Sequence, residues 1–139
     1  MHHPPERLTA LRPPRLLQVL TGAALAAAAL TLPAQAEIVT ITFGDERRFS
    51  HRFDVAPGKF AEACGQLPRD SAVQWRFSAS LPLNFNIHYH EGKAVTYPEK
   101  LNGSTGANGM LRIAVNEAYC WMWTNKTAQP VVVTVELLL

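Results

Sequence analysis

Apolar and polar residues alternate with a period of two along most of the chain after residue 36, and this pattern limits the possible folds most strongly. In the segment 37–43, for example, Val39, Ile41 and Phe43 share one side. Successive side chains of a β-strand point to opposite faces, so the alternation predicts half-buried strands. The pattern recurs in the segments 47–55, 71–80, 81–90, 93–100, 110–116, 118–125 and 130–139. About eight short strands separated by turn residues predict an all-β fold, an antiparallel two-sheet β-sandwich.

Three stretches depart from the alternation. The segment KFAEACGQL, residues 59–67, follows a Pro-Gly pair and predicts a short helical or irregular crossing. The segment Leu101–Gly109 is rich in Gly, Asn and Ser, which predicts a flexible surface loop. Pro82 stands between two predicted strands and indicates either a break or a bulged edge, because proline cannot donate to a strand ladder.

Residues 1–36 have the order of a secretory signal peptide. Three arginines at positions 7, 12 and 15 precede an apolar run over residues 16–32, and Ala34-Gln35-Ala36 follows. This order predicts a helical leader that is cleaved after Ala36, which leaves a single β-sandwich domain over residues 37–139. An uncleaved anchor is the alternative, because the apolar run is near the lower limit of about 17 residues for a membrane span.

The exported part is electrically balanced. Residues 1–36 hold three of the thirteen Lys and Arg residues and one of the eleven Asp and Glu residues, so ten of each sign remain. No basic run is left to favour nucleic acid. The alanine-rich leader favours a bacterial protein that is periplasmic or secreted. We expect no nucleic-acid partner and no stable membrane anchor after the leader is removed.

The two cysteines, Cys64 and Cys120, both lie in the exported part. An oxidising compartment permits a disulfide between them, and closing so long a loop is worth about 3 to 4.5 kcal/mol on the chain-entropy model. Two separate thiols are the alternative, but no Cys-x-x-Cys pair supports a metal-binding interpretation. The sequence therefore predicts a Cys64–Cys120 disulfide.

The stretch NFNIHYHEG places His88 and His90 on the same face of a predicted strand. Two imidazoles at positions i and i+2 can close on one metal ion, but at least one further ligand is required. The candidates for it are Glu91, Met122, Met110 and His51. A thioether beside imidazoles favours copper(I). The alternative interpretation is a solvated polar face or a protein-binding surface.

The most aromatic stretch of the chain, YCWMWTN, puts Tyr119, Trp121 and Trp123 on one side of a strand. Buried tryptophan commonly packs around the disulfide of a β-sandwich, so one interpretation is core. The other is that these three side chains form an exposed hydrophobic surface for a partner.

Three stretches, CGQL, FNIHYHEGKAVTYP and EAYCWMWTNKTAQPVVVTVEL, resemble GOLD-type domains, the lumenal β-sandwich domains of cargo receptors. The matching elements are Cys64 with Leu67, then the strand 85–87 with Gly92, then Cys120 with Asn125. The resemblance spans residues 55–139. It implies a jelly-roll-like sandwich, a disulfide and binding through a sheet face or loops. The chain has no coiled coil or membrane helix after the sandwich, so the receptors' transport role is not expected.

Support for catalysis is weak. The sequence has no nucleophile elbow, zinc-protease helix or phosphate-binding glycine loop. Asp54, Asp70 and Glu91 are isolated along the chain. We therefore expect an exported binding or interaction module for an unknown protein or small ligand, and not an enzyme. The alternative is a periplasmic copper-binding protein that uses His88 and His90.

Overall fold

The computed structural model describes residues 36–139, and the predicted leader lies outside them except for Ala36. The described residues form seven strands and contain no helix. The strands are β1 (Glu37–Thr40), β2 (Arg48–Val55), β3 (Phe60–Gln66), β4 (Ala72–Glu91), β5 (Ala94–Arg112), β6 (Ala118–Thr124) and β7 (Val131–Leu138). Residues 36–139 include no helix that is long and apolar enough to cross a membrane. The all-β prediction is confirmed.

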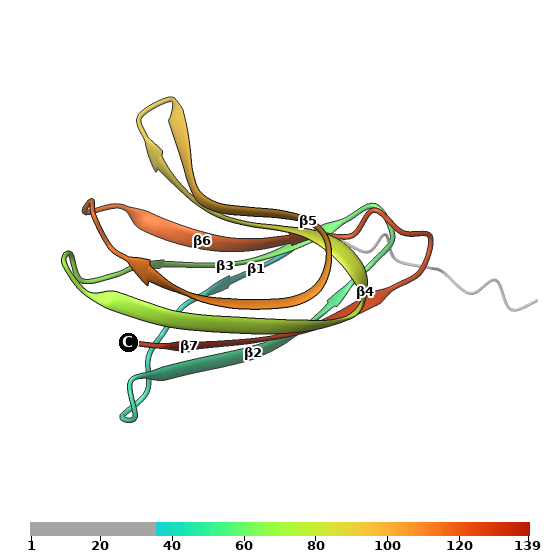
Figure 1. Cartoon of the computed structure of the whole chain (residues 1–139), viewed down its shortest axis with the longest axis horizontal. Coiled ribbons are helices and arrows are strands. Elements are labelled where there is room, and N and C mark those ends of the chain that lie inside the picture. Colours follow the sequence, from blue (N-terminus) through green and yellow to red (C-terminus); the bar gives the residue numbers. More distant parts are fainter. Residues whose placement is uncertain (1–35) are drawn as a thin grey trace, which may run out of the picture. The chain divides into compact units, whose positions relative to one another are not determined.

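The strands belong to one mixed sheet. Their order is β1-β3-β6-β4-β7-β2, and β5 pairs with β4 outside this path. All the pairs are antiparallel except β1 with β3, which is parallel. The prediction of a purely antiparallel fold is therefore wrong at the first strand. Figure 1 shows how the sheet curls so that β2 and β7 lie in one wall and β3 and β6 in the other.

The strand β4 runs through both walls because it bends near its middle. Its residues 74–79 pair with β7, and its residues 84–89 pair with β6. The register against β5 shifts between Ser78 and Leu83, and Pro82 stands inside this shift. The Ser80 hydroxyl accepts a hydrogen bond of 2.9 Å from the Val132 amide, which ties the bend to β7. The result is a sheet nearly closed into a barrel, and the two separate sheets of a sandwich are not confirmed.

The segment 59–67 is not a helical crossing but contains the strand β3. Ala61, Ala63 and Gly65 point into the barrel, directly opposite the large aromatic residues of β6. A Cβ atom at Gly65 would come within 2.9 Å of the Ile41 side chain. Glycine at position 65 thus makes room for Ile41, and pairing with β6 overrides the helix propensity of the two alanines.

The segment Leu101–Gly109 is not a surface loop either, because it forms much of β5. Its backbone pairs with β4, from Leu101 opposite Phe85 to Gly109 opposite Trp75. A Cβ atom at position 109 would lie 2.7 Å from the Trp75 ring, so glycine here admits the indole. The turn-like composition reflects this packing and a bulge at Gly103, whose φ of 64° favours glycine.

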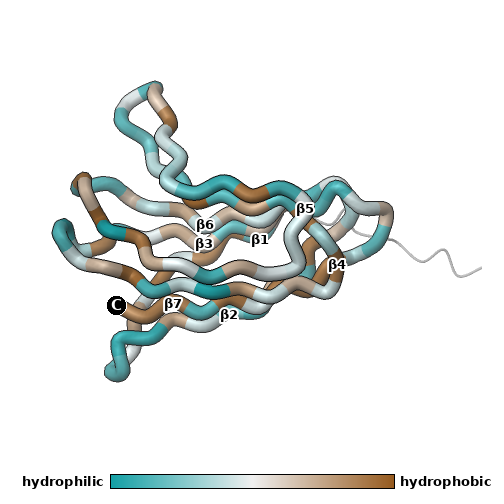
Figure 2. Tube along the Cα trace, in the orientation of Figure 1, coloured by the Kyte–Doolittle hydropathy of each residue, from teal (hydrophilic) through white to brown (hydrophobic). Residues whose placement is uncertain are grey.

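The interior is filled by the inward-facing side chains of both walls, and the strands alternate between hydrophobic and hydrophilic residues (Figure 2). Trp123 joins the two walls, with ring centroids 5.7 Å from Phe85, 6.0 Å from Phe77 and 5.4 Å from Phe53. The predicted Cys64–Cys120 disulfide is confirmed and links directly opposite residues of β3 and β6 that are 56 positions apart in sequence.

Candidate functional site

The turn between β4 and β5 projects beyond the barrel. The strand β4 pairs with β6 only as far as Tyr89, whereas its pairing with β5 continues to Glu91 opposite Ala94. Gly92, with φ of 61°, and Lys93 make the turn. Residues 90–97 are therefore a two-stranded ribbon, and Figure 1 shows it rising away from the other strands. We call this segment the projecting hairpin.

The projecting hairpin is polar with a short hydrophobic stretch (Figure 2). Val95 and Tyr97 are its exposed large apolar side chains. Tyr97 lies in a bulge, since β4 pairs with Thr96 and then with Glu99. Pro98 shares this bulge, a position where its missing N–H costs no ladder hydrogen bond. A strand hydrogen-bonded to its neighbour presents these side chains in a fixed arrangement.

At the base of the hairpin, His88 is buried although it lies on the outer face of the barrel. Its Nδ1 is 2.8 Å from the Asn86 side-chain oxygen, and its Nε2 is 3.2 Å from Glu62 Oε1. The His88 and Glu62 side chains are only 9% and 13% exposed. Each of the two ring nitrogens therefore has a side-chain oxygen atom beside it.

Aromatic and basic side chains cover the contact between His88 and Glu62. The Tyr97 ring centroid lies 5.8 Å from that of His88, and the His90 ring stands edge-on at 5.3 Å. Lys100 Nζ lies 4.2 Å from the centroid of the Tyr97 ring, within the range of a cation–π contact. The base of the hairpin is thus held by contacts to β3 as well as to β5, which fixes the direction in which the hairpin projects.

The four predicted metal ligands come together only in part. His88 and His90 are neighbours on the outer face, and Met122 is on the same face beside Asn86. Both nitrogens of His88 are occupied, however, and a metal ion needs a free lone pair. Glu91 lies beyond the pairing with β6, near the exposed turn. Within residues 36–139, Glu62, Cys64 and Cys120 are the one group of His, Cys, Asp and Glu ligand atoms close enough to share an ion, and the disulfide removes both thiolates.

Tyr119, Trp121 and Trp123 lie in the core and do not form an exposed surface. All three side chains are fully buried, because β6 turns this side of the strand toward the interior. The Tyr119 hydroxyl accepts hydrogen bonds from the Ala114 and Val115 amides. The surface interpretation of these residues is wrong, and the core interpretation holds.

Several residues of this site were missed in the sequence. Glu62 is two positions before Cys64, so a strand over residues 60–66 would have placed it on the outer face beside the disulfide. Because residues 59–67 were predicted to be a helical or irregular crossing, the placement of Glu62 on the same face as Cys64 was not recognised. Tyr97 could have been found from its place next to Pro98, where a bulge is favoured.

Sequence comparison gives no relatives: no family profile matches the chain, and no curated protein is detectably similar to it. The predicted likeness to GOLD domains therefore stays a prediction.

The fold, by contrast, resembles solved structures. One is PliG from Aeromonas hydrophila, a periplasmic lysozyme inhibitor of g-type lysozyme, with a TM-score of 0.56 and 11% identity over 74% of this chain and 97% of that chain. Another is the Yersinia pseudotuberculosis-derived mitogen, with a TM-score of 0.53 and 5% identity over 66% of this chain and 85% of that chain. Identities this low show a shared small β-rich fold, and fold alone does not fix function.

Proposed function

We propose that the protein is an exported, non-catalytic module that binds another protein through the projecting hairpin. The observation that carries the proposal is the extension of β4 and β5 past the end of β6, which presents Val95 and Tyr97 on a hydrogen-bonded ribbon. A preformed ribbon loses little conformational freedom on binding, so more of its contact energy appears as affinity. Tyrosine is also enriched among the residues that dominate protein interfaces.

The paired carboxylates of the described residues support a binding role rather than catalysis. Glu62 lies against His88, Asp54 against Arg52, and Glu136 against two arginines. Each of these carboxylates is thus paired with a basic side chain, and none of the three lies against a second carboxylate as in the acid and base pair of a glycoside hydrolase.

The shared fold suggests the first partner to test. The similar structure from Aeromonas hydrophila is an inhibitor of g-type lysozyme in the periplasm. By analogy, we propose a periplasmic location for this chain and an enzyme of the lysozyme kind as a candidate partner. The disulfide and the signal-like order of residues 1–36 agree with export.

Metal binding by His88, His90, Glu91 and Met122 stays the alternative prediction. The two adjacent imidazoles favour it. The contacts of His88 to Asn86 and Glu62 oppose it, because an ion would have to displace at least one of them.

The partner is tested with the full chain expressed in a bacterial host and purified with its disulfide intact. We expect it to reduce the activity of a g-type lysozyme, and we expect the double variant Val95→Ser/Tyr97→Ser to have lost that effect. Arg52→Gln is the matched control, since this exposed residue lies on β2, outside the hairpin. If neither the protein nor the variant inhibits the enzyme at about 10 μM, lysozyme is not the partner.

A further inference from the structure

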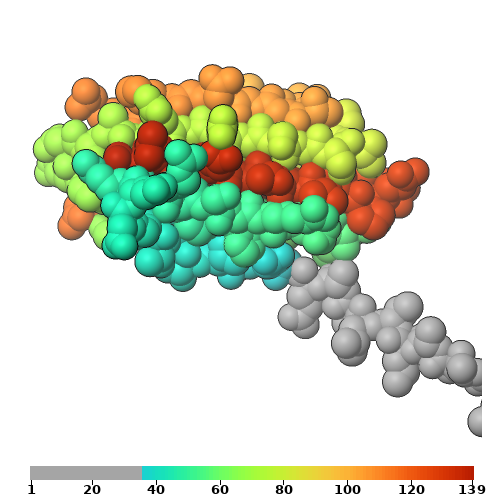
Figure 3. Space-filling view, turned by 90° about the horizontal axis from the view of Figure 1, so that it is seen from below, coloured from blue at the N-terminus to red at the C-terminus, as the bar shows by residue number. Residues whose placement is uncertain are grey.

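The wall opposite the disulfide carries a second feature, an open hollow on its outer face. The strands β2, β7, β4 and β5 lie side by side in this wall, as the bands of the space-filling view show (Figure 3). The hollow has a volume of about 840 Å³, within the range of about 300 to 1,000 Å³ common for ligand sites. Its outward-facing side chains include Arg48, Gln74, Arg76, Met110, Glu136 and Leu138. We call it the arginine groove.

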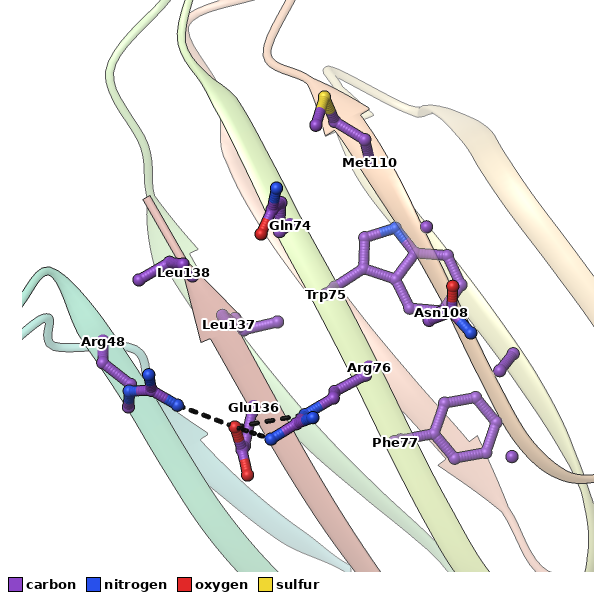
Figure 4. A pocket seen from close by; sticks show the side chains of 13 residues that line it. Arg48, Gln74, Trp75, Arg76, Phe77, Asn108, Met110, Glu136, Leu137 and Leu138 are labelled. Atoms are coloured by element: carbon purple, nitrogen blue, oxygen red, sulfur yellow. Dashed lines mark hydrogen bonds and ion pairs between the residues drawn. The ribbon is translucent and has the colours of Figure 1, made fainter.

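Glu136 and Arg76 lie in one row of the groove, and the Arg48 side chain reaches Glu136 from the neighbouring row. Glu136 Oε2 accepts from Arg48 at 2.9 Å and from Arg76 at 2.6 and 3.2 Å (Figure 4). A single carboxylate thus serves two guanidinium groups, each of which has five N–H donors. The arginine side chains are 48% and 66% exposed, so their remaining donors are available to a ligand. Asn108 lies next to Arg76 on β5 in the same row.

The next row of the groove has two apolar side chains, and Arg48 stands at its outer end opposite Leu138. Leu138 and Met110 lie on either side of Gln74, and both are exposed large hydrophobic side chains. This row is two residues along each strand from the charged row, a separation of about 6.6 Å. An extended peptide also repeats its side chains on one face every two residues, so it can match the two rows at once.

We propose that the arginine groove binds an extended, acidic peptide segment of a partner protein. A carboxylate of the segment pairs with Arg48 and Arg76, and an apolar side chain two positions away lies between Leu138 and Met110. The groove is on the first half of β4 and the projecting hairpin continues its second half, so this site goes beyond the proposed function and is independent of it.

The probe is the blocked peptide acetyl-Ser-Leu-Ser-Glu-Ser-amide, titrated into the isotopically labelled full chain and followed by NMR. We expect the amides of residues 74–77, 106–110 and 136–138 to shift, and the same peptide with Gln in place of Glu to bind at least about fivefold more weakly. A Gln peptide that binds equally, or shifts confined to the projecting hairpin, would overturn the proposal.

Three variants separate recognition from general charge. Arg76→Gln should weaken binding at least about fivefold, whereas Arg52→Gln, an equally exposed arginine paired with Asp54, should leave it unchanged. Glu136→Gln should strengthen binding about threefold, because it frees both guanidinium groups from their internal partner. Equal losses in Arg76→Gln and Arg52→Gln, or a loss in Glu136→Gln, would contradict the assignment. Thermal unfolding of each variant verifies that it remains folded.

Discussion

The two halves of β4 have the same interior role but very different outer faces. Trp75 and Phe77 of the first half, like Phe85 and Ile87 of the second, point into one continuous core. Outside, the first half carries an exposed cluster of charges beside an open groove. The second half carries a buried His88–Glu62 pair beside the disulfide and then leaves the barrel as the projecting hairpin.

This difference separates what holds the barrel together from what is available to a partner. Buried contacts contribute most to stability, because water cannot replace the hydrogen bond of a buried polar group that has lost its partner. Exposed ion pairs contribute little to stability, so their side chains are available for binding. The comparison predicts that substitutions of buried residues will lower the free energy of unfolding most. Substitutions of exposed residues should affect the binding of a partner and change stability little.

The largest effect is expected where the two walls meet, at Trp123. Trp123→Ala removes the ring that contacts aromatic residues from both halves of β4 and should lower the free energy of unfolding by about 3 to 5 kcal/mol. Trp123→Phe is the control. It should cost less, because the indole N–H of Trp123 has no hydrogen-bond partner to lose. Urea unfolding measures both variants, and equal losses would show that the N–H has a role that the structure does not reveal.

Next in size is the disulfide, which staples only one wall. Cys64→Ala/Cys120→Ala should lower the free energy of unfolding by about 3 to 4 kcal/mol, since the unfolded chain gains conformational entropy when the cross-link is removed. Because the bond joins β3 to β6, hydrogen exchange should accelerate first in those strands and later in β2 and β7. Uniform acceleration across both walls would mean that they do not unfold as separate units.

The two ion pairs give a direct test of the burial argument. Glu62→Ala should cost about 1 to 3 kcal/mol, because it leaves the buried His88 ring without its acceptor. Glu136→Ala should cost at most about 1 kcal/mol, because its arginine partners are already largely solvated. Chemical unfolding of the two variants under identical conditions measures the difference. Similar losses of stability in Glu62→Ala and Glu136→Ala would mean that burial does not distinguish the outer faces of the two halves of β4.

A smaller effect is expected from metal ions. Both nitrogens of His88 are occupied, so we expect copper or zinc to bind no more tightly than about 10 μM, and 100 μM of either ion to stabilise the protein by at most about 1.4 kcal/mol. Native mass spectrometry and thermal unfolding measure this. Tight stoichiometric binding that is lost in His88→Ala/His90→Ala would put the metal interpretation first.

The smallest effect on folding should come from the projecting hairpin. Val95→Ser/Tyr97→Ser changes partly exposed side chains and should lower the free energy of unfolding by at most about 1 kcal/mol, because only the Tyr97 contacts to His88 and Lys100 are lost. The same variant should lose its partner. If it instead unfolds as readily as Trp123→Ala, the hairpin is part of the core structure and not a free binding element.

The sequence predicted the strands that have an alternating apolar pattern of their own. It missed the strands whose conformation depends on pairing with residues distant in the sequence. Alternation in residues 47–55 and 118–125 identified β2 and β6, and the two cysteines of residues 37–139 identified the disulfide. The glycine-rich segment 101–109 has no strand pattern of its own, and its conformation is set by β4 across the hairpin. The continuity of β4 through Pro82 likewise depends on β5 following both of its halves.

The candidate site shows the same division. His88 and His90 were recognised from their spacing on one strand. Their environment could not be, because Glu62 comes from β3 and Tyr97 from the bulge of β5. Sequence spacing alone therefore left a metal pair and a solvated polar face as alternatives, whereas three-dimensional contacts show a buried histidine beside a carboxylate.

The most direct test of the central claim is photo-crosslinking of the full chain expressed in a bacterial host. A benzoylphenylalanine is placed at Lys93 in the hairpin turn or, in a second strain, at the exposed Asp54 of β2. The account predicts one discrete crosslinked protein from position 93, none from position 54, and its loss in the Val95→Ser/Tyr97→Ser background. Equal products from both positions, or a product that survives in the double variant, would contradict binding through the hairpin.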